Sequence, residues 1–224
     1  MPPGQLSMET ARMAGLFLET MSLAIVALFP IMNPFSTAPL FVSLTADFDE
    51  HKRQRQALLG CVYAFGILIV FLLMGSAIID FFGISLAGIR AAGGLIILIT
   101  GFRMLFTNPS SAPASSGRTD IAFTPIAMPS LAGPGSISVV LSAVGRIEDM
   151  DPRHWPEIYA AIIVGMAVTL AISYLVLRAA GVMVRFLGRD GIDAMTRIFG
   201  FLLTCIGVQF LLTGVADFLE LPHQ

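Results

Sequence analysis

Hydrophobic residues run along this chain in long uninterrupted stretches, with the polar residues gathered between them. Four stretches are plain, and they cover residues 57–79, 84–106, 158–177 and 198–216. A helix needs about 20 predominantly apolar residues to cross the hydrocarbon core of a bilayer. Each of the four stretches therefore predicts a transmembrane helix.

Two further apolar segments are each interrupted by proline near the middle. Segment 20–46 carries no charge and centres on Asn33-Pro34, the first break; segment 121–145 is also uncharged and centres on Gly133-Pro134, the second break. Lipid cannot hydrogen-bond the backbone groups that an interrupted helix exposes, so another partner must. Interrupted segments in corresponding halves of a chain are typical of the binding site of a secondary transporter.

A polar segment divides the predicted spans into two sets. Residues 107–120 (T-N-P-S-S-A-P-A-S-S-G-R-T-D) are rich in serine and proline and predict a flexible linker. The linker splits one integral membrane domain, 1–224, into a first repeat, 14–106, and a second repeat, 121–217. Each repeat has an interrupted span, a plain span and a glycine-rich span. The predicted fold is an all-α membrane protein with six transmembrane helices in a 3+3 inverted repeat, in which helices 1 and 4 are discontinuous.

The glycine-rich third spans of the two repeats resemble each other. An F-x-G element precedes each, ending at Gly83 and at Gly188. The register in which these two spans align stays open. Pairing Arg90 with Arg197 aligns one set of glycines, and shifting that pairing by one residue aligns a different set. Small residues recur every seven positions and predict helix packing faces; they are Ala87, Gly94 and Gly101, and Gly200, Gly207 and Gly214.

Lysine and arginine are unevenly shared between the two sides of the predicted membrane. Nine lie on the side of the linker and four on the other, which carries both termini. Positive residues accumulate on the cytoplasmic side, so both termini are predicted to be non-cytoplasmic. This orientation requires both interrupted segments to cross fully, since a re-entrant hairpin would invert the spans after it. Arg90, Arg103 and Arg197 are near span ends and are expected to reach the interface.

Composition supports a membrane protein and excludes several other classes. The 224 residues are 56% hydrophobic and 12% charged, and the mean hydropathy is +0.84, far from a soluble domain. A net charge of −2 gives no basic surface for nucleic acid. No phosphate-binding loop occurs, and Cys61 and Cys205 are expected to be buried hydrophobic side chains. We expect no enzyme, no metal and no resident cofactor, with any coupling proton or sodium ion unassigned.

The local chemistry of both breaks predicts a helix that stops and restarts. Proline disfavours helix in the residue before it, so Phe29 and Met128 are the predicted stops. Asparagine and glycine are accepted as N-caps, and proline is favoured at the first helical position. New half-helices are therefore predicted to begin at Asn33-Pro34 and Gly133-Pro134.

Such restarts suit a ligand that carries one negative and one positive charge. The N-terminus of a half-helix presents free N–H groups and a partial positive charge, which favour a carboxylate. Unwound carbonyls, expected at 30–33 and 129–133, can accept from an ammonium group or a cation. The predicted ligand is therefore a zwitterion.

Small side chains surround the breaks and supply the candidate site. The predicted substrate-binding residues are Asn33, Pro34, Ser36, Thr37, Ala132, Gly133, Pro134, Gly135, Ser136 and, from the last span, Gln209. Small residues also let membrane helices pack closely, so packing is the alternative interpretation for each serine. For Gln209 the alternative is a hydrogen bond between helices.

Several motifs resemble the MarC family of six-span bacterial membrane proteins, also called the neutral amino acid transporter family. They are F-P-I-M-N-P-F-S-T-A-P-L-F at 29–41, F-G-I-S at 82–85, R-A-A-G-G at 90–94, P-S-L-A-G-P-G-S-I at 129–137 and R-I-F-G-F-L-L at 197–203. The resemblance implies an inner-membrane protein similar to transporters of glycine and alanine, and also to proteins once named for antibiotic resistance. The family's motif residues correspond here to Asn33, Pro34, Gly133, Pro134 and Gly135.

The leading functional hypothesis is a secondary transporter of small neutral amino acids that works by alternating access. One alternative is a non-transporting membrane assembly or regulatory component in which the breaks are packing hinges. Another is a drug-type exporter, which requires a larger apolar cavity. The expected partners are a small zwitterionic solute and the lipid bilayer, with no nucleic acid, and a homo-oligomer stays open as an alternative.

Overall fold

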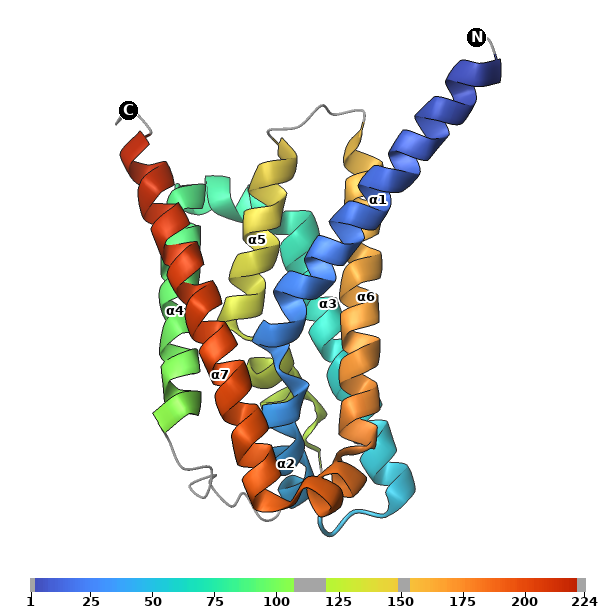
Figure 1. Ribbon diagram of the computed structural model, residues 1–224, viewed down its shortest axis with the longest axis vertical. Coiled ribbons are helices and arrows are strands. Elements are labelled where there is room, and N and C mark those ends of the chain that lie inside the picture. Colours follow the sequence, from blue (N-terminus) through green and yellow to red (C-terminus); the bar gives the residue numbers. More distant parts are fainter. Residues whose placement is uncertain (1–2, 107–119, 149–153, 221–224) are drawn as a thin grey trace.

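The computed structural model describes residues 3–106, 120–148 and 154–220 of the chain, which form a bundle of helices (Figure 1). The described helices are α1 (Pro3–Met32), α2 (Pro34–Leu44), α3 (Glu50–Phe82), α4 (Leu86–Phe106), η2 (Ala122–Leu131), α5 (Pro134–Glu148), α6 (Trp155–Arg178) and α7 (Ala180–Glu220). Both chain ends lie at one end of the bundle, which we call the terminal end (Figure 1). All regular structure in the described residues is helical.

The four plain spans predicted from the sequence are confirmed as long apolar helices. Five helices are long and apolar enough to cross a membrane, and they cover Arg12–Met32, Glu50–Phe82, Leu86–Phe106, Trp155–Arg178 and Asp190–Leu219. The segments Ala122–Leu131 and Pro134–Gly145, which meet at 58°, make a sixth if they are counted as one span. The division into repeats stays a prediction, because residues 107–119 of the predicted linker lie outside the described residues.

The first interrupted segment differs from its prediction, because α1 does not stop at Phe29. It continues through Pro30 to Met32, and the Asn33 N–H still donates to the Phe29 carbonyl at 3.1 Å. Proline removes the hydrogen bond of its own nitrogen and crowds the preceding turn, but the bond from Asn33 to Phe29 still holds the last turn together. The predicted unwound carbonyls at 30–33 are therefore replaced by a helix that ends in a single non-helical residue, Asn33.

The second interrupted segment is irregular over a longer stretch than predicted. In η2, the Ile126 and Ala132 N–H groups donate to carbonyls five residues earlier, at 3.3 and 2.8 Å, which is the wide π-helical pattern. Thr124 and Met128 have extended backbone angles, as expected for residues that precede proline. Met128 is a non-helical position, but η2 continues past this predicted stop to Leu131, and α5 begins at Pro134 as predicted.

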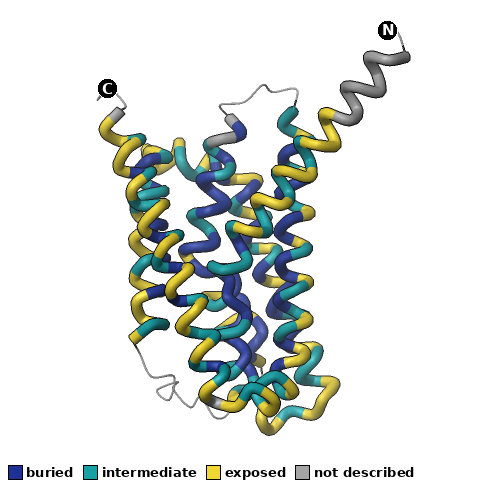
Figure 2. Tube along the Cα trace, in the orientation of Figure 1, coloured by how far each residue is buried: buried dark blue, intermediate teal, exposed yellow. Residues whose placement is uncertain are grey.

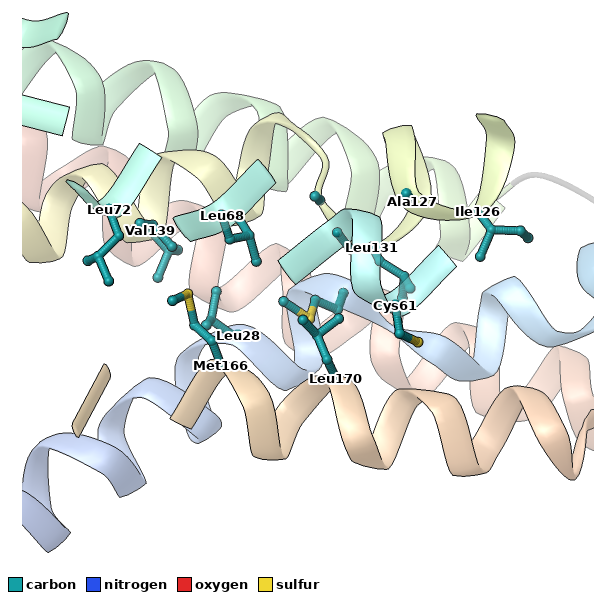
Figure 3. Packing of buried hydrophobic residues seen from close by; sticks show 14 of the residues in the cluster. Leu28, Cys61, Leu68, Leu72, Ile126, Ala127, Leu131, Val139, Met166 and Leu170 are labelled. Carbon is teal, nitrogen blue, oxygen red and sulfur yellow. The ribbon is translucent and has the colours of Figure 1, made fainter. Parts of the chain in front are cut away.

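Burial follows the bundle axis (Figure 2). Leu28 of α1, Leu68 of α3, Leu131 of η2 and Met166 of α6 belong to one buried hydrophobic cluster (Figure 3). Many large apolar side chains are exposed on the outer faces, as helices surrounded by lipid require. Cys61 is buried as predicted, but Cys205 is exposed, because a helix that is apolar all round does not reveal from its sequence which face is inside.

Two F-x-G elements each end in a glycine with positive φ, but the glycines differ in ψ, which is 32° at Gly83 and −175° at Gly188. Gly83 precedes α4 with φ 61°, and Gly188 interrupts α7 with φ 66°. Glycine takes positive φ without steric cost. The phenylalanines before them are strongly exposed, Phe81 at 84% and Phe186 at 88%. The two turns lie at opposite ends of the bundle (Figure 1).

Helices α4 and α7 pack through a glycine seam, formed by Gly94 and Gly101 of α4 and Gly200, Gly207 and Gly214 of α7. A Cβ at Gly94 would stand 2.4 Å from the Leu211 nitrogen, and one at Gly207 would stand 2.5 Å from the Leu98 nitrogen. The obstacles are backbone atoms, so the helices would have to move apart. The predicted packing faces are confirmed, with small residues allowing close approach of the two backbones.

Gly207→Ala is therefore expected to lower the apparent melting temperature of the purified protein in detergent. Overpacking of this kind costs about 1–3 kcal/mol. Gly66→Ala is the matched control, because no atom lies within 4 Å of a Cβ built at this exposed glycine of α3, and alanine there gains about 1 kcal/mol of helix propensity. A Gly207→Ala protein as stable as the Gly66→Ala protein would contradict the seam.

Candidate functional site

The first break is a tight turn made by Asn33 alone. Its φ of 37° and ψ of 69° are left-handed, a conformation that asparagine tolerates better than most residues. Its side-chain Oδ1 accepts from the Ser36 N–H at 3.3 Å and caps α2. Its carbonyl accepts from the hydroxyls of Ser36 and Thr37 at 3.1 and 3.4 Å. The predicted restart at Asn33-Pro34 is confirmed.

Three aromatic rings flank the first break, one before it, one after it and one from a distant helix. Phe29 and Phe35 meet edge to face with centroids 6.1 Å apart, and Phe35 stacks on Phe199 of α7 at 5.1 Å. Rings at these separations attract one another. This contact holds the two halves of the interrupted segment against α7.

Two side chains bond backbone groups at the two ends of η2, which precedes the second break. The Ile121 N–H donates to Oε1 of Gln56, a buried residue of α3, at 3.0 Å. The Ser136 hydroxyl of α5 donates back to the Leu131 carbonyl, also at 3.0 Å. Gly133 is required by space, since a Cβ there would lie 2.5 Å from the Pro129 carbonyl oxygen.

The two breaks are neighbours in space. A Cβ at Gly135 would lie 3.1 Å from Cγ2 of Ile31, so the first turn of α5 contacts the last turn of α1. From this region α5 runs to the terminal end, whereas α2 runs to the opposite end (Figure 1). Two half-helix N-termini thus start near each other and point away in opposite directions.

The predicted site residues at the breaks are mostly enclosed by protein. Pro134 is exposed and Ser36 is partly exposed, and seven others are buried: Asn33, Pro34, Thr37, Ala132, Gly133, Gly135 and Ser136. Asn33 is 3% exposed and Ser136 is 1% exposed. In this conformation a solute has little access to the break residues.

A cavity of about 390 Å³ lies on the terminal side of both breaks. Along α1 its lining ends at Leu28, five residues before Asn33, and along α5 it begins at Val139, six residues after Gly133. Much of the wall is aliphatic and includes Leu23, Leu28, Val139, Val140, Ile158 and Ile162. Of the ten predicted site residues, Gln209 lines this cavity.

Polar groups on α4 and α7 form one edge of the cavity. The Arg90 side chain is 11% exposed and pairs with the Asp217 carboxylate. A nearby carboxylate stabilises a cation held among helices, and the expectation that Arg90 reaches the interface stays a prediction. Arg103 and Arg197 are exposed. Gln209 Nε2 donates to Thr213 Oγ1 within α7 at 3.4 Å.

A family model for MarC family integral membrane proteins matches residues 11–219. The chain belongs to the MarC family. An inner membrane protein MarC from Citrobacter koseri is 37% identical, and the match covers 92% of this chain and 98% of the relative. Proteins with the same name from Escherichia coli K12 and Shigella flexneri are 36% identical with equal coverage. No solved structure matches the chain.

Membership confirms the family resemblance seen in the sequence motifs. The relatives' names and the apolar helices support a multi-pass inner membrane protein. The region matched by the MarC family model contains both breaks, the glycine seam and the cavity. Among the described residues, no group of three His, Cys, Asp or Glu side chains could hold a metal ion.

Sequence reasoning missed three groups at the site of this MarC-family protein. Gln56 follows a basic stretch with Lys52, Arg53 and Arg55 and resembles the polar end of a span, yet it is 7% exposed and holds the start of η2. Asp217 lies beyond the predicted end of the last span, so its pairing with Arg90 had no local signal. Phe199 meets the first break only through the fold.

Asn33→Ala is expected to destabilise the protein more than Asn33→Gly. Alanine loses the N-cap, worth about 1 kcal/mol, and resists left-handed angles by about 1–2 kcal/mol. Glycine also loses the side chain, but it accepts positive φ, and replacing an N-cap by glycine costs only a few tenths of a kcal/mol. Apparent melting temperatures in detergent give the order of stability of the two variants. An Asn33→Gly protein whose melting temperature is equal to or lower than that of Asn33→Ala would refute this account of the turn.

Proposed function

We propose that this MarC-family protein is a secondary transporter of small neutral amino acids such as glycine or alanine, working by alternating access. The observation that carries the proposal is the pair of neighbouring breaks, from which α2 and α5 run to opposite ends of the bundle. Interrupted helices of this kind form the substrate sites of several transporter folds. The cavity lies on the terminal side of the breaks, next to α1 and α5.

The proposed binding groups at the breaks are backbone atoms and small polar side chains. The first turns of α2 and α5 carry N–H groups without intrahelical acceptors, and these favour a carboxylate. The irregular backbone of η2 supplies carbonyls for an ammonium group or a coupling cation. The first break contributes less to binding the ammonium group or cation, because the Asn33 carbonyl already accepts hydrogen bonds from two hydroxyls.

The proposed arrangement of the chain is a 3+3 inverted repeat, 14–106 and 121–217. Three paired features support it: the two breaks, the half-helices of opposite direction, and the positive-φ glycines Gly83 and Gly188 at opposite ends. Both termini are proposed to be non-cytoplasmic, in accordance with the distribution of positive residues.

Alternating access explains why the break residues are enclosed by protein. The break residues are buried while the cavity lies on the terminal side. We propose that movement of α1 and α5 relative to the other helices joins the cavity to the breaks in one state and separates them in another. The residues at helix ends, Asn33 and Gly133, are where such a hinge absorbs the change.

A second candidate function has one observation in its favour. Asn33, Thr37 and Ser136 are packed by protein rather than facing the cavity, which is what packing hinges in a non-transporting assembly or regulatory component require. This candidate predicts no solute flux. A drug-type exporter lacks comparable support, because Arg90, which lines the cavity and pairs with Asp217, favours a charged head group.

Uptake of labelled glycine or alanine into proteoliposomes that contain the purified protein tests the proposal. We expect uptake above protein-free liposomes, and stimulation by a proton or sodium gradient identifies the coupling ion. Absence of uptake for a range of small amino acids under both gradients would exclude the proposed transport and favour the second candidate.

Asn33→Leu is expected to abolish uptake without unfolding the protein. Leucine removes the amide acceptor, resists left-handed angles and places bulk at the start of α2. Asn33→Gly is the matched control, because it keeps the turn and the free N–H groups and should retain most of the uptake. Equal amounts of reconstituted protein are required, and wild-type uptake by Asn33→Leu would remove the capped restart from the transport site.

A further inference from the structure

We propose that the cavity on the terminal side binds an amino acid with an aliphatic side chain, holding its zwitterionic head between Arg90 and Asp217. The inference rests on the proposed function in that the ligand is a solute which the protein transports. It adds a second site, distinct from the breaks, and a preference for side chains larger than those of glycine and alanine.

The first support is the division of the cavity into an apolar body and a charged edge. Leu23, Leu28, Val139 and Ile162 belong to the wall, whereas Arg90 and Gln209 line the polar side. A volume of about 390 Å³ lies in the range of about 300–1,000 Å³ found for small-molecule pockets. A ligand that fits has an apolar portion and a compact charged head.

The second support is that the fold does not need the ion pair to hold α4 against α7. Next to the pair, a Cβ at Gly214 would stand 2.4 Å from the Ala91 nitrogen, so the two helices are already in backbone contact. Arg90 and Asp217 are 11% and 33% exposed. An ionisable group within a membrane span most often marks a ligand or ion pathway.

A zwitterion matches this pair better than a singly charged molecule. Its carboxylate can accept two parallel hydrogen bonds from the Arg90 guanidinium, while its ammonium group pairs with Asp217. Both protein charges then remain neutralised. A carboxylic acid without an amine must instead displace Asp217 and leave that carboxylate unpaired, which is costly in a partly buried site.

The third support is an unsatisfied hydroxyl in the cavity wall. Ser142 of α5 is 5% exposed, and its Oγ has no hydrogen-bond partner among the described residues. One turn earlier, the Ser138 hydroxyl donates to the Pro134 carbonyl at 2.9 Å. A buried polar group without a partner is uncommon in native proteins. Since Ser142 lines the cavity, it is placed to donate to the bound ligand.

The aliphatic wall sets the order of preference among neutral amino acids. Each methylene buried against it contributes about 0.8 kcal/mol, or about a fourfold gain in affinity. We therefore expect L-leucine and L-isoleucine to bind more tightly than L-alanine, and L-alanine more tightly than glycine.

The experiment measures binding to purified full-length protein in detergent by calorimetry, without requiring transport. Three probes share one carbon skeleton: L-leucine, 4-methylpentanoate without the amine, and 3-methylbutylamine without the carboxylate. For the wild type, L-leucine is expected to bind most tightly. Equal affinities for the three probes, or no binding of L-leucine, would overturn the inference.

Two substitutions separate a binding role from a structural one. Arg90→Gln should weaken the binding of L-leucine about tenfold or more, as expected for the loss of a hydrogen bond to a charged group. Asp217→Asn should reverse the preference, so that 4-methylpentanoate binds better than L-leucine. Arg103→Gln and Asp190→Asn, at exposed positions of the same helices, are the matched controls and should change neither value. A purely structural pair would weaken all probes alike, and that outcome would overturn the inference.

Ser142→Ala is expected to change stability and ligand affinity in opposite directions. Removing an unsatisfied buried hydroxyl should raise the melting temperature of the unliganded protein, while the affinity for L-leucine should fall. Ser138→Ala is the control and should leave L-leucine affinity unchanged, since Ser138 is bonded within its own helix. Unchanged L-leucine affinity in Ser142→Ala would exclude that hydroxyl from the site.

Failure of the inference and failure of the proposed function are distinguishable. Uptake of glycine or alanine by a protein that does not bind L-leucine would leave the proposed transport standing and overturn the cavity site. Binding of L-leucine in the expected pattern, with no uptake of any amino acid, would support the cavity site and overturn transport.

Discussion

The structure depends on one constraint, which is that backbone groups freed inside a membrane must be hydrogen-bonded within the protein. At the first break the Asn33 side chain and two nearby hydroxyls meet this demand. In the second segment, Ser136 of α5 bonds the Leu131 carbonyl beside the break, and Gln56 of α3 bonds the Ile121 N–H at the start of η2. Because these partners are side chains rather than a continuing helix, the interruptions can persist while the helices around them stay packed.

Helices α4 and α7 form a closely packed pair within the bundle. The glycine seam brings the backbones of α4 and α7 into direct contact, which fixes their spacing. The cavity lies between this pair and α1, α5 and α6, with Arg90 and Gln209 on one side and aliphatic side chains on the others. Both breaks lie outside the glycine seam. We therefore expect a substrate path along α1 and α5, where packing can change without separating the seam.

Much of this arrangement could be predicted from local patterns. The plain spans, both helix restarts and the packing faces follow from hydropathy, capping rules and seven-residue spacing. The stop at Phe29 was wrong, because one proline near a helix end removes a single hydrogen bond that the neighbouring bonds outweigh. The pairing of Arg90 was missed because its partner is 127 residues away. The candidate residues at the breaks could be named, but their degree of enclosure could not.

The sequence by itself determined where helices cross, where two of them are interrupted and which small residues approach a neighbour, since these follow from chain-local hydrophobicity and backbone geometry. Only the tertiary structure decided that the two breaks are adjacent, that Gln56 holds the start of η2, and that Arg90, which pairs with Asp217, lines a cavity. Helices that are apolar on every side carry little information about which neighbours they choose. That choice is made by packing and by the pairing of the few polar groups between them.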